Sequence, residues 1–192
     1  MRVLLIGAPG AGKGTQAARI ARHFGLTHIS SGDLLRRHVD EGTTIGRQVA
    51  EYIDRGDLVP DAIIMDMLYK PVMAASASGG YILDGFPRTV EQAEAAYAVA
   101  GELGVQVQLA VHIEVPADEL TRRLKARGRG EDDSESVITH RLKVYEDKTM
   151  PLLAYYAERE KLVTVNGGRP VDEVTWSIVV QLQRARRKHL VD

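Results

Sequence analysis

A glycine-rich segment near the N-terminus has the spacing of a phosphate-binding loop. Gly7–Thr15 reads Gly-Ala-Pro-Gly-Ala-Gly-Lys-Gly-Thr and follows the apolar run Val3–Ile6. Its glycines let backbone N–H groups turn toward phosphate oxygens, and the helix expected to start there adds N–H groups and a positive dipole end. Lys13 supplies a point charge for the β- and γ-phosphates, and Thr15 can serve Mg²⁺ or a phosphate oxygen. The usual pattern has Ser or Thr directly after the lysine, whereas Gly14 intervenes here.

Two further motifs carry charged residues. Ser30–Arg36 reads Ser-Ser-Gly-Asp-Leu-Leu-Arg, and Asp84–Thr89 reads Asp-Gly-Phe-Pro-Arg-Thr. Asp84 follows the apolar run Tyr81–Leu83, and we expect it to orient Mg²⁺ through water, because Mg²⁺ keeps several of its waters. Asp33 is a second candidate for the residue that orients the waters of Mg²⁺. Alternatively, the carboxylate of Asp33 only interacts with the positive start of a helix.

The elements that must position these residues alternate along the chain. Short apolar runs are separated by longer amphipathic ones, which is the pattern of a parallel sheet with crossover helices. We expect a helix over Lys13–Phe24, stopped by Gly25, and a last helix over residues 171–188. Five strands and about five crossover helices make a doubly wound α/β domain that binds ligands at the carboxyl ends of its strands. The expected strands are Val3–Ile6, Thr27–Ser30, Tyr81–Leu83, Leu109–Val115 and Leu162–Val165.

Two stretches break this alternation and are interpreted as insertions on a common core. From Ser31 to Leu58, two helical segments follow each other without a strand between them, hinged at glycines. From Arg127 to Glu135 the chain is glycine-rich and acidic, which predicts an exposed loop. A helix is then expected to start near Asp132 or Asp133, where carboxylates suit the positive helix end.

Three residues inside the predicted elements have a structural interpretation. Pro71 interrupts the helical pattern of Ile63–Leu68, so that this helix is expected to end or kink near Lys70. His28 and His112 lie in or beside strands, and we interpret them as packed residues rather than metal ligands.

The composition excludes several kinds of site. The chain has 192 residues, no cysteine and a net charge of -1, with 44% hydrophobic and 27% charged residues. A disulfide framework, a thiolate zinc site, a cysteine nucleophile and an iron–sulfur cluster are therefore excluded. The net charge is too small to attract nucleic acid or an anionic membrane. No apolar run is long enough for a signal peptide or a membrane span. We expect a cytoplasmic protein without nucleic-acid or membrane partners.

Together, the loop and the two motifs resemble those of the adenylate kinases, from Met1 to the last helix. The resemblance implies the P-loop nucleoside monophosphate kinase fold and reversible transfer of the γ-phosphoryl group of ATP to AMP, giving two ADP, with Mg²⁺. It implies one kinase domain over residues 1–192, divided into three parts. These are a core of residues 1–29, 60–125 and 137–192, an AMP-binding insertion of residues 30–59 and a short lid of residues 126–136.

The short lid carries its own implication. Several members of the family have a long lid, often with cysteine ligands for zinc, whereas this lid is short and holds no cysteine. We therefore expect no zinc. Relatives with this layout are commonly monomers, and the implied partners are ATP, AMP and ADP.

Such a reaction needs charge neutralisation rather than a general base. The acceptor is a phosphate oxygen that is already deprotonated at neutral pH, so that the protein must bring two polyanions together and exclude water. Arginine suits this work because its planar fork binds phosphate bidentately and keeps its charge.

The resemblance assigns a role to each of the arginines. Any one of them taken alone is more simply interpreted as a charged residue on the solvent-exposed face of a helix. Arg36 and Arg88 would hold the AMP phosphate, and Arg129 and Arg141 would close over the phosphates in transfer. Arg127 would contact ATP, and Arg123 would flank the ATP base.

Base recognition is assigned to a few polar residues. By resemblance, Gln92 reads the adenine edge of AMP; alternatively, it forms a capping box with Thr89, three residues earlier. Ser31 keeps the hydroxyl that adenylate kinases usually carry on Thr, where pyrimidine nucleotide kinases usually have Ala, so that it favours AMP over UMP or CMP. The backbone carbonyl of Arg169 would touch the ATP base.

The implied site residues form two overlapping sets and no direct metal site. The ATP set is Gly10, Ala11, Gly12, Lys13, Gly14, Thr15, Arg123, Arg127 and Arg169. The AMP set is Ser31, Arg36, Asp57, Leu58, Val59, Gly85, Phe86, Pro87, Arg88, Gln92, Arg129 and Arg141. The catalytic residues among them are Lys13, Arg88, Arg129 and Arg141.

Two alternative functions stay open. One is a UMP/CMP kinase, which Ser31 and Thr89 disfavour. The other is a nucleotide-binding switch without catalysis, against which the presence of Lys13, Asp84 and the lid arginines argues.

Overall fold

The computed structural model describes residues 1–127 and 134–189, which fold around one parallel sheet. The strand order is β2-β3-β1-β4-β5, so that β1 lies at the centre, with Leu4 paired to Leu83 on one side and to Ala110 on the other. This confirms the predicted doubly wound α/β fold. The strands are β1 (Arg2–Ile6), β2 (Thr27–Ser30), β3 (Tyr81–Asp84), β4 (Leu109–Glu114) and β5 (Leu162–Asn166).

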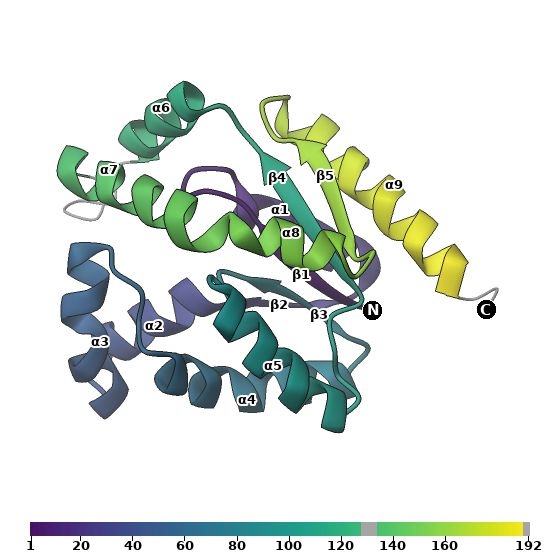
Figure 1. Cartoon of the computed structure of the whole chain (residues 1–192), viewed down its shortest axis with the longest axis horizontal. Coiled ribbons are helices and arrows are strands. Elements are labelled where there is room, and N and C mark those ends of the chain that lie inside the picture. Colours follow the sequence, from purple (N-terminus) through teal and green to yellow (C-terminus); the bar gives the residue numbers. More distant parts are fainter. Residues whose placement is uncertain (128–133, 190–192) are drawn as a thin grey trace.

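The alternation of side chains along β1 divides the core into two layers. Val3 and Leu5 pack with α1 (Lys13–Phe24) and α9 (Val171–His189) on one face of the sheet. Leu4 and Ile6 face the other layer, which contains α4 (Asp61–Ala77), α5 (Val90–Glu102) and α8 (Pro151–Ala157). Because successive strand residues point to opposite faces, a buried strand with helices on both sides must be apolar throughout, as β1 is. In Figure 1, α9 lies to the right of β5, and α4 and α5 lie below the strands.

The insertion before β3 is a pair of helices, α2 (Ser31–Asp40) and α3 (Thr44–Arg55), as predicted. Ser30 and Thr43 cap them by accepting hydrogen bonds from backbone N–H groups three residues on. Gly46 allows the two helices to approach closely, because a Cβ atom there would lie 1.9 Å from the carbonyl oxygen of His38. In Figure 1 this pair lies at the lower left, below α7 (Glu135–Val144).

Two predicted helix boundaries differ from the structure. The α4 helix does not end near Lys70 but continues through Pro71 to Ala77. Ile64, Leu68 and Ala75 on either side of the proline are buried in one core, and this tertiary packing outweighs the lost backbone hydrogen bond.

The helix after the acidic loop also begins later than predicted. The N-cap residue of α7 is Ser134 and its first residue is Glu135, rather than Asp132 or Asp133, and the predicted loop lies mostly outside the described residues. A serine N-cap followed by a carboxylate satisfies the same preference for negative charge at a helix start. The remaining elements are α6 (Ala117–Arg127) and a π-helical turn, η2 (Tyr145–Thr149), which joins α7 to α8. Within the two described ranges, no helix combines the length and the hydropathy that crossing a bilayer requires.

Candidate active site

A cleft of about 910 Å³ opens at the carboxyl ends of the central strands. The phosphate-binding loop forms its floor, and residues from α2, α6, α7 and the start of α9 form its walls. Doubly wound sheets bind ligands at this edge because loops from neighbouring strands converge there. The cleft therefore lies where the sequence predicted it.

The phosphate-binding loop is shaped by two glycines with left-handed backbone angles. Gly10 and Gly12 have φ values of 85° and 89°, and α1 starts directly after Gly12. The ammonium group of Lys13 donates hydrogen bonds to the carbonyl oxygens of Gly7 (2.8 Å) and Ala8 (3.1 Å), so that its charge lies over the loop. In the described chain no side chain caps α1, and its first turn holds no acidic residue. This arrangement suits an anion at the start of the helix.

Asp84 ends β3 inside the cleft and faces the phosphate-binding loop. Its side chain is 12% exposed, and a Cβ atom at Gly14 would lie 3.7 Å from its Oδ2. His28 stands on the other side, with Nε2 3.9 Å from the same oxygen. That nitrogen is buried and makes no hydrogen bond within the described residues. The prediction that His28 is packed did not anticipate that it lines the cleft.

The other candidate carboxylate has a local partner. Asp33 forms an ion pair with Arg36 on the same helix and lies in the first turn of α2, as the helix-charge alternative expects. His112 is buried, and its Nε2 lies 3.3 Å from the hydroxyl oxygen of Tyr145. In the described part of the chain, no three His, Asp or Glu side chains gather in a way that could hold a metal ion.

Three arginines converge between the loop and the insertion. Burial lowers the pKa of Arg88, the carboxylate of Asp84 opposes this shift, and the positive charges of Arg141 and Arg36 add to it. The Nε atom of Arg88 donates to the carbonyl oxygen of Gly85 at 2.8 Å, which fixes the guanidinium group at the end of β3. A cluster of positive charges of this kind is expected where a polyanionic ligand binds.

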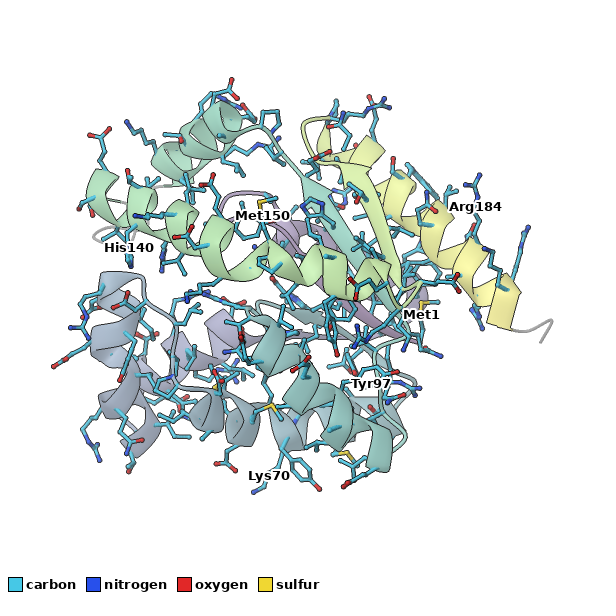
Figure 2. The ribbon with its side chains drawn as sticks, in the orientation of Figure 1. Met1, Lys70, Tyr97, His140, Met150 and Arg184 are labelled. Carbon is cyan, nitrogen blue, oxygen red and sulfur yellow. The ribbon has the colours of Figure 1, made fainter. Side chains whose placement is uncertain are left out.

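Arg141 reaches this cluster from α7. A Cβ atom at Gly56 would lie 2.9 Å from Cγ of Arg141, so that α7 sits directly over the end of α3. His140, labelled in Figure 2, reinforces the contact, with Nε2 2.8 Å from Oδ1 of Asp57. The structure thus brings α7 against the end of α3.

A smaller cavity of about 50 Å³ continues from the cleft toward α4 and α5. Ser31 and Gln92 line it and are almost fully buried, 1% and 3% exposed. Gln92 forms three polar contacts: its N–H donates to Thr89 Oγ1, its Oε1 accepts from the N–H of Arg88, and its Nε2 donates to Asp61 Oδ1. A capping box would instead return the side chain to the N–H of Thr89 itself. The side chain of Gln92 is therefore held, but not in the pattern of a capping box.

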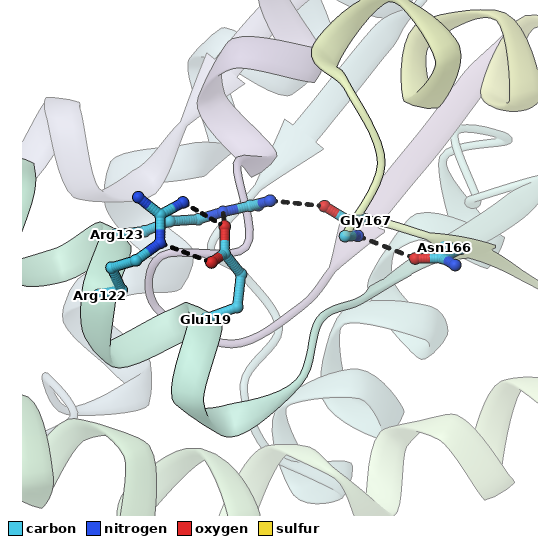
Figure 3. Close-up of polar contacts among 6 residues, drawn as sticks. Glu119, Arg122, Arg123, Asn166 and Gly167 are labelled. Atoms are coloured by element: carbon cyan, nitrogen blue, oxygen red, sulfur yellow. Dashed lines mark hydrogen bonds and ion pairs between the residues drawn. The ribbon is translucent and has the colours of Figure 1, made fainter.

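The far wall of the cleft contains a contact network that the sequence analysis missed (Figure 3). Glu119 Oε1 accepts one hydrogen bond from Arg122 and one from Arg123, and the nitrogen–oxygen distance is 2.7 Å in both ion pairs. These bonds lower the pKa of Glu119 to about 2. Arg123 also donates to the carbonyl oxygen of Gly167 at 3.0 Å, which ties α6 to the turn after β5. The spacing of three and four residues on one helix was the available signal.

Most of the predicted site residues come together around these two spaces. The cleft is lined by Gly10, Ala11, Gly12, Lys13, Gly14, Thr15, Asp33, Arg36, Asp84, Arg88, Arg123, Arg141 and Arg169. The smaller cavity is lined by Ser31, Asp57, Leu58, Val59, Gly85, Phe86 and Gln92. Arg36, Arg88 and Arg141 line both spaces, and Pro87 lines the cleft. Arg129 and the side chain of Arg127 lie outside the described residues.

Comparison with known proteins decides the family. The family model described as adenylate kinase matches residues 5–161. The chain belongs to the adenylate kinase family.

Relatives in this family match almost end to end. The adenylate kinase of Mycobacteroides abscessus is 48% identical over 174 residues, which cover 91% of this chain and 94% of that protein. The adenylate kinase of Mycobacterium tuberculosis is 45% identical over the same shares, and adenylate kinase 1 of Synechocystis is 41% identical over 92% and 94%. The resemblance in the sequence and the fold that it implied are thus confirmed.

Proposed function

We propose that the chain is an ATP:AMP phosphotransferase, which moves the γ-phosphoryl group of ATP to AMP and forms two ADP reversibly. The observation that carries the proposal is the position of the Arg36, Arg88 and Arg141 cluster. These residues line both the cleft above the phosphate-binding loop and the smaller cavity that holds Gln92. Cations that face two adjoining spaces suit a reaction in which two polyanions must meet.

ATP occupies the cleft in this proposal. The backbone of Gly10–Thr15 and the ammonium group of Lys13 bind its phosphates, because glycine-shaped N–H groups and a helix start stabilise negative charge. Arg123 and the backbone of Arg169 flank its base, near the turn that Arg123 already contacts through Gly167. Arg127 completes this donor side.

AMP occupies the smaller cavity and the adjoining part of the cleft. Arg36 and Arg88 hold its phosphate, with the backbone of Asp57, Leu58 and Val59 along the insertion. Gly85, Phe86 and Pro87 form the wall beside Arg88, and Ser31 and Gln92 present polar groups to the base. Arg129 and Arg141 close over the phosphoryl group as it moves.

The residues around Asp84 fit a magnesium ion that enters with ATP. Mg²⁺ prefers oxygen ligands, keeps several waters and is commonly bound by one or two carboxylates and the substrate phosphates. Asp84 lies beside Gly14 and the start of α1, and Thr15 lines the same cleft. When bound, the ion would neutralise part of the phosphate charge. Asp84 would orient its water shell, with Asp33 as the weaker candidate because it is paired with Arg36.

Exclusion of water is assigned to the two insertions. We propose that residues 30–59 and the lid of residues 126–136 move against the core of residues 1–29, 60–125 and 137–192. The contact of His140 and Arg141 with Asp57 and Gly56 supports closure between these parts. Closing a site in this way prevents transfer of the phosphoryl group to water. We further propose a cytoplasmic monomer that acts on free nucleotides.

An enzyme-coupled assay of ADP formation tests this function. ATP with Mg²⁺ is supplied with AMP, UMP, CMP or GMP in turn, and the Lys13→Met variant controls for contaminating kinases. We expect AMP to be the best acceptor, with the activity lost in the variant. Preference for UMP or CMP would identify a pyrimidine nucleotide kinase, and ATP binding without transfer to any acceptor would favour the switch.

A further inference from the structure

The side-chain amide of Gln92 is held by two different kinds of partner. The backbone N–H of Arg88 donates to its Oε1 at 2.8 Å, and its Nε2 donates to Oδ1 of Asp61 at 2.7 Å. A glutamine amide carries two N–H donors and two acceptor positions on oxygen. One donor and one acceptor position of the amide are therefore engaged by these partners, and one of each is left beside the cavity that Gln92 lines.

These partners permit one orientation of the amide. A backbone N–H can only donate, and an ionised carboxylate can only accept. If the amide turned over, its NH₂ group would face the N–H of Arg88 and its oxygen would face the carboxylate of Asp61, so that both contacts would become repulsive. With Gln92 only 3% exposed, water could not relieve them.

We infer that Asp61 is a positioning residue for acceptor selection, because it holds the Gln92 amide so that its donor and acceptor face the base in a fixed order. The inference rests on the proposed function. An amide with a fixed donor and acceptor matches a base edge in which an acceptor nitrogen stands beside an amino group, as in a 6-aminopurine. A 6-oxopurine presents a ring N–H beside a carbonyl oxygen, which is the reverse order. Asp61 thus selects for AMP and against IMP, its 6-oxo counterpart of nearly the same shape.

The location of Asp61 suits this role. It is the first residue of α4, 31 positions before Gln92, and lies two residues after the end of the proposed insertion. A carboxylate suits the positive start of a helix, and its oxygens accept hydrogen bonds such as the one from Nε2 of Gln92. A merely structural aspartate at this position would also stabilise α4, but it would have no influence on the choice of base.

The test compares acceptor selectivity in Asp61→Asn and Asp61→Glu. Asparagine has nearly the same shape but can turn its own amide to pair with a reversed Gln92, whereas glutamate keeps the carboxylate. For each variant, kcat and KM are measured with AMP, with IMP and with ATP, together with thermal unfolding. We expect Asp61→Asn to lower the AMP-to-IMP ratio of kcat/KM about tenfold, the scale of one hydrogen bond to a charged group. The KM for AMP should carry the change, with the KM for ATP unaffected and partial recovery in Asp61→Glu.

Two controls separate this role from helix stabilisation. Asp118→Asn removes a carboxylate from the first turn of α6 and should leave the ratio unchanged. In a Gln92→Ala background, Asp61→Asn should have no further effect on the ratio, because Asp61 acts through Gln92. An unchanged ratio in Asp61→Asn, with or without a lower unfolding temperature, would overturn the inference while the proposed function stands. A wild-type chain that transfers no phosphoryl group to AMP would overturn both.

Discussion

The proposed donor and acceptor halves of the site are built from different chemical groups. On the donor side, a short continuous segment, Gly10–Thr15, presents backbone groups and one ammonium group. On the acceptor side, side chains from α2, the turn after β3, α4 and α5 must come together around Gln92 before a base can be recognised. Backbone N–H groups recognise phosphate, which all nucleotides share, whereas an oriented side-chain amide recognises the edge of one base. We therefore expect a permissive donor site and a selective acceptor site.

The largest effect should come from the donor side, where a single charge follows the transferred group. Lys13→Met keeps most of the side-chain length and removes the ammonium group. Loss of one preorganised donor at a transition state typically costs about 100- to 1,000-fold in kcat, and we expect a loss of that order with an unchanged unfolding temperature. Steady-state kinetics and thermal unfolding measure both. Near-normal turnover would show that the phosphate-binding loop does not serve the reaction.

On the acceptor side, Arg88→Lys should be the most damaging conservative change. Lysine keeps the charge but loses the planar fork that binds phosphate at two points. Because hydrogen bonds to charged groups contribute about 1.5–3 kcal/mol, kcat/KM for AMP should fall roughly ten- to 100-fold. The same change at Arg123, on the donor wall, serves as the comparison and should alter kcat/KM for AMP much less. Equal losses at the two positions would remove the distinction between the halves.

Gln92→Ala should affect the acceptor alone. Leaving a hydrogen-bonded base edge unmatched costs on the order of 1–3 kcal/mol, which raises the KM for AMP about fivefold or more while the KM for ATP stays constant. Gln16→Ala is a matched control, because Gln16 is also 3% exposed and makes two side-chain hydrogen bonds, to Val171 and Thr175. Its loss should lower the unfolding temperature without a selective effect on AMP. Equal effects of Gln92→Ala on both nucleotides would support a structural role.

The smallest effect is expected at Glu119, which holds Arg122 and Arg123 in an exposed network. Ion pairs near the surface are weak because water and salt screen them, so that Glu119→Gln should raise the KM for ATP no more than about fivefold. Hydrogen bonds from the two arginines lower the pKa of Glu119 from 4.5 to about 2. The stabilisation from this carboxylate is thus fully present above pH 4.5 and is lost as the pH falls toward 2.

Thermal unfolding at a series of pH values checks this sign. The difference in unfolding temperature between the wild type and Glu119→Gln should be constant from pH 6 to pH 9 and shrink only below about pH 4.5. A difference that varied near neutral pH would place the titration on another group.

The same contrast explains what the sequence could predict. The phosphate-binding loop is local, so that its spacing alone predicted its position between β1 and α1. The five strands and the paired helices of the insertion followed from periodicity in the same way. The hydrogen bond between Gln92 and Asp61 joins residues 31 positions apart, and no local sequence pattern predicts such a pair. The predicted end of α4 near Lys70 was wrong for a related reason, since packing on both sides of Pro71 outweighs its local preference.

Specificity constants for both nucleotides test the central claim most directly. ATP, GTP, CTP and UTP are compared as donors to AMP, and AMP, GMP, CMP and UMP as acceptors from ATP, with kcat/KM measured for each pair. If backbone groups recognise the donor and an oriented amide recognises the acceptor, the spread among acceptors should exceed the spread among donors by about tenfold or more, since one matched hydrogen bond alone is worth roughly that factor. A donor spread equal to or larger than the acceptor spread would contradict the account.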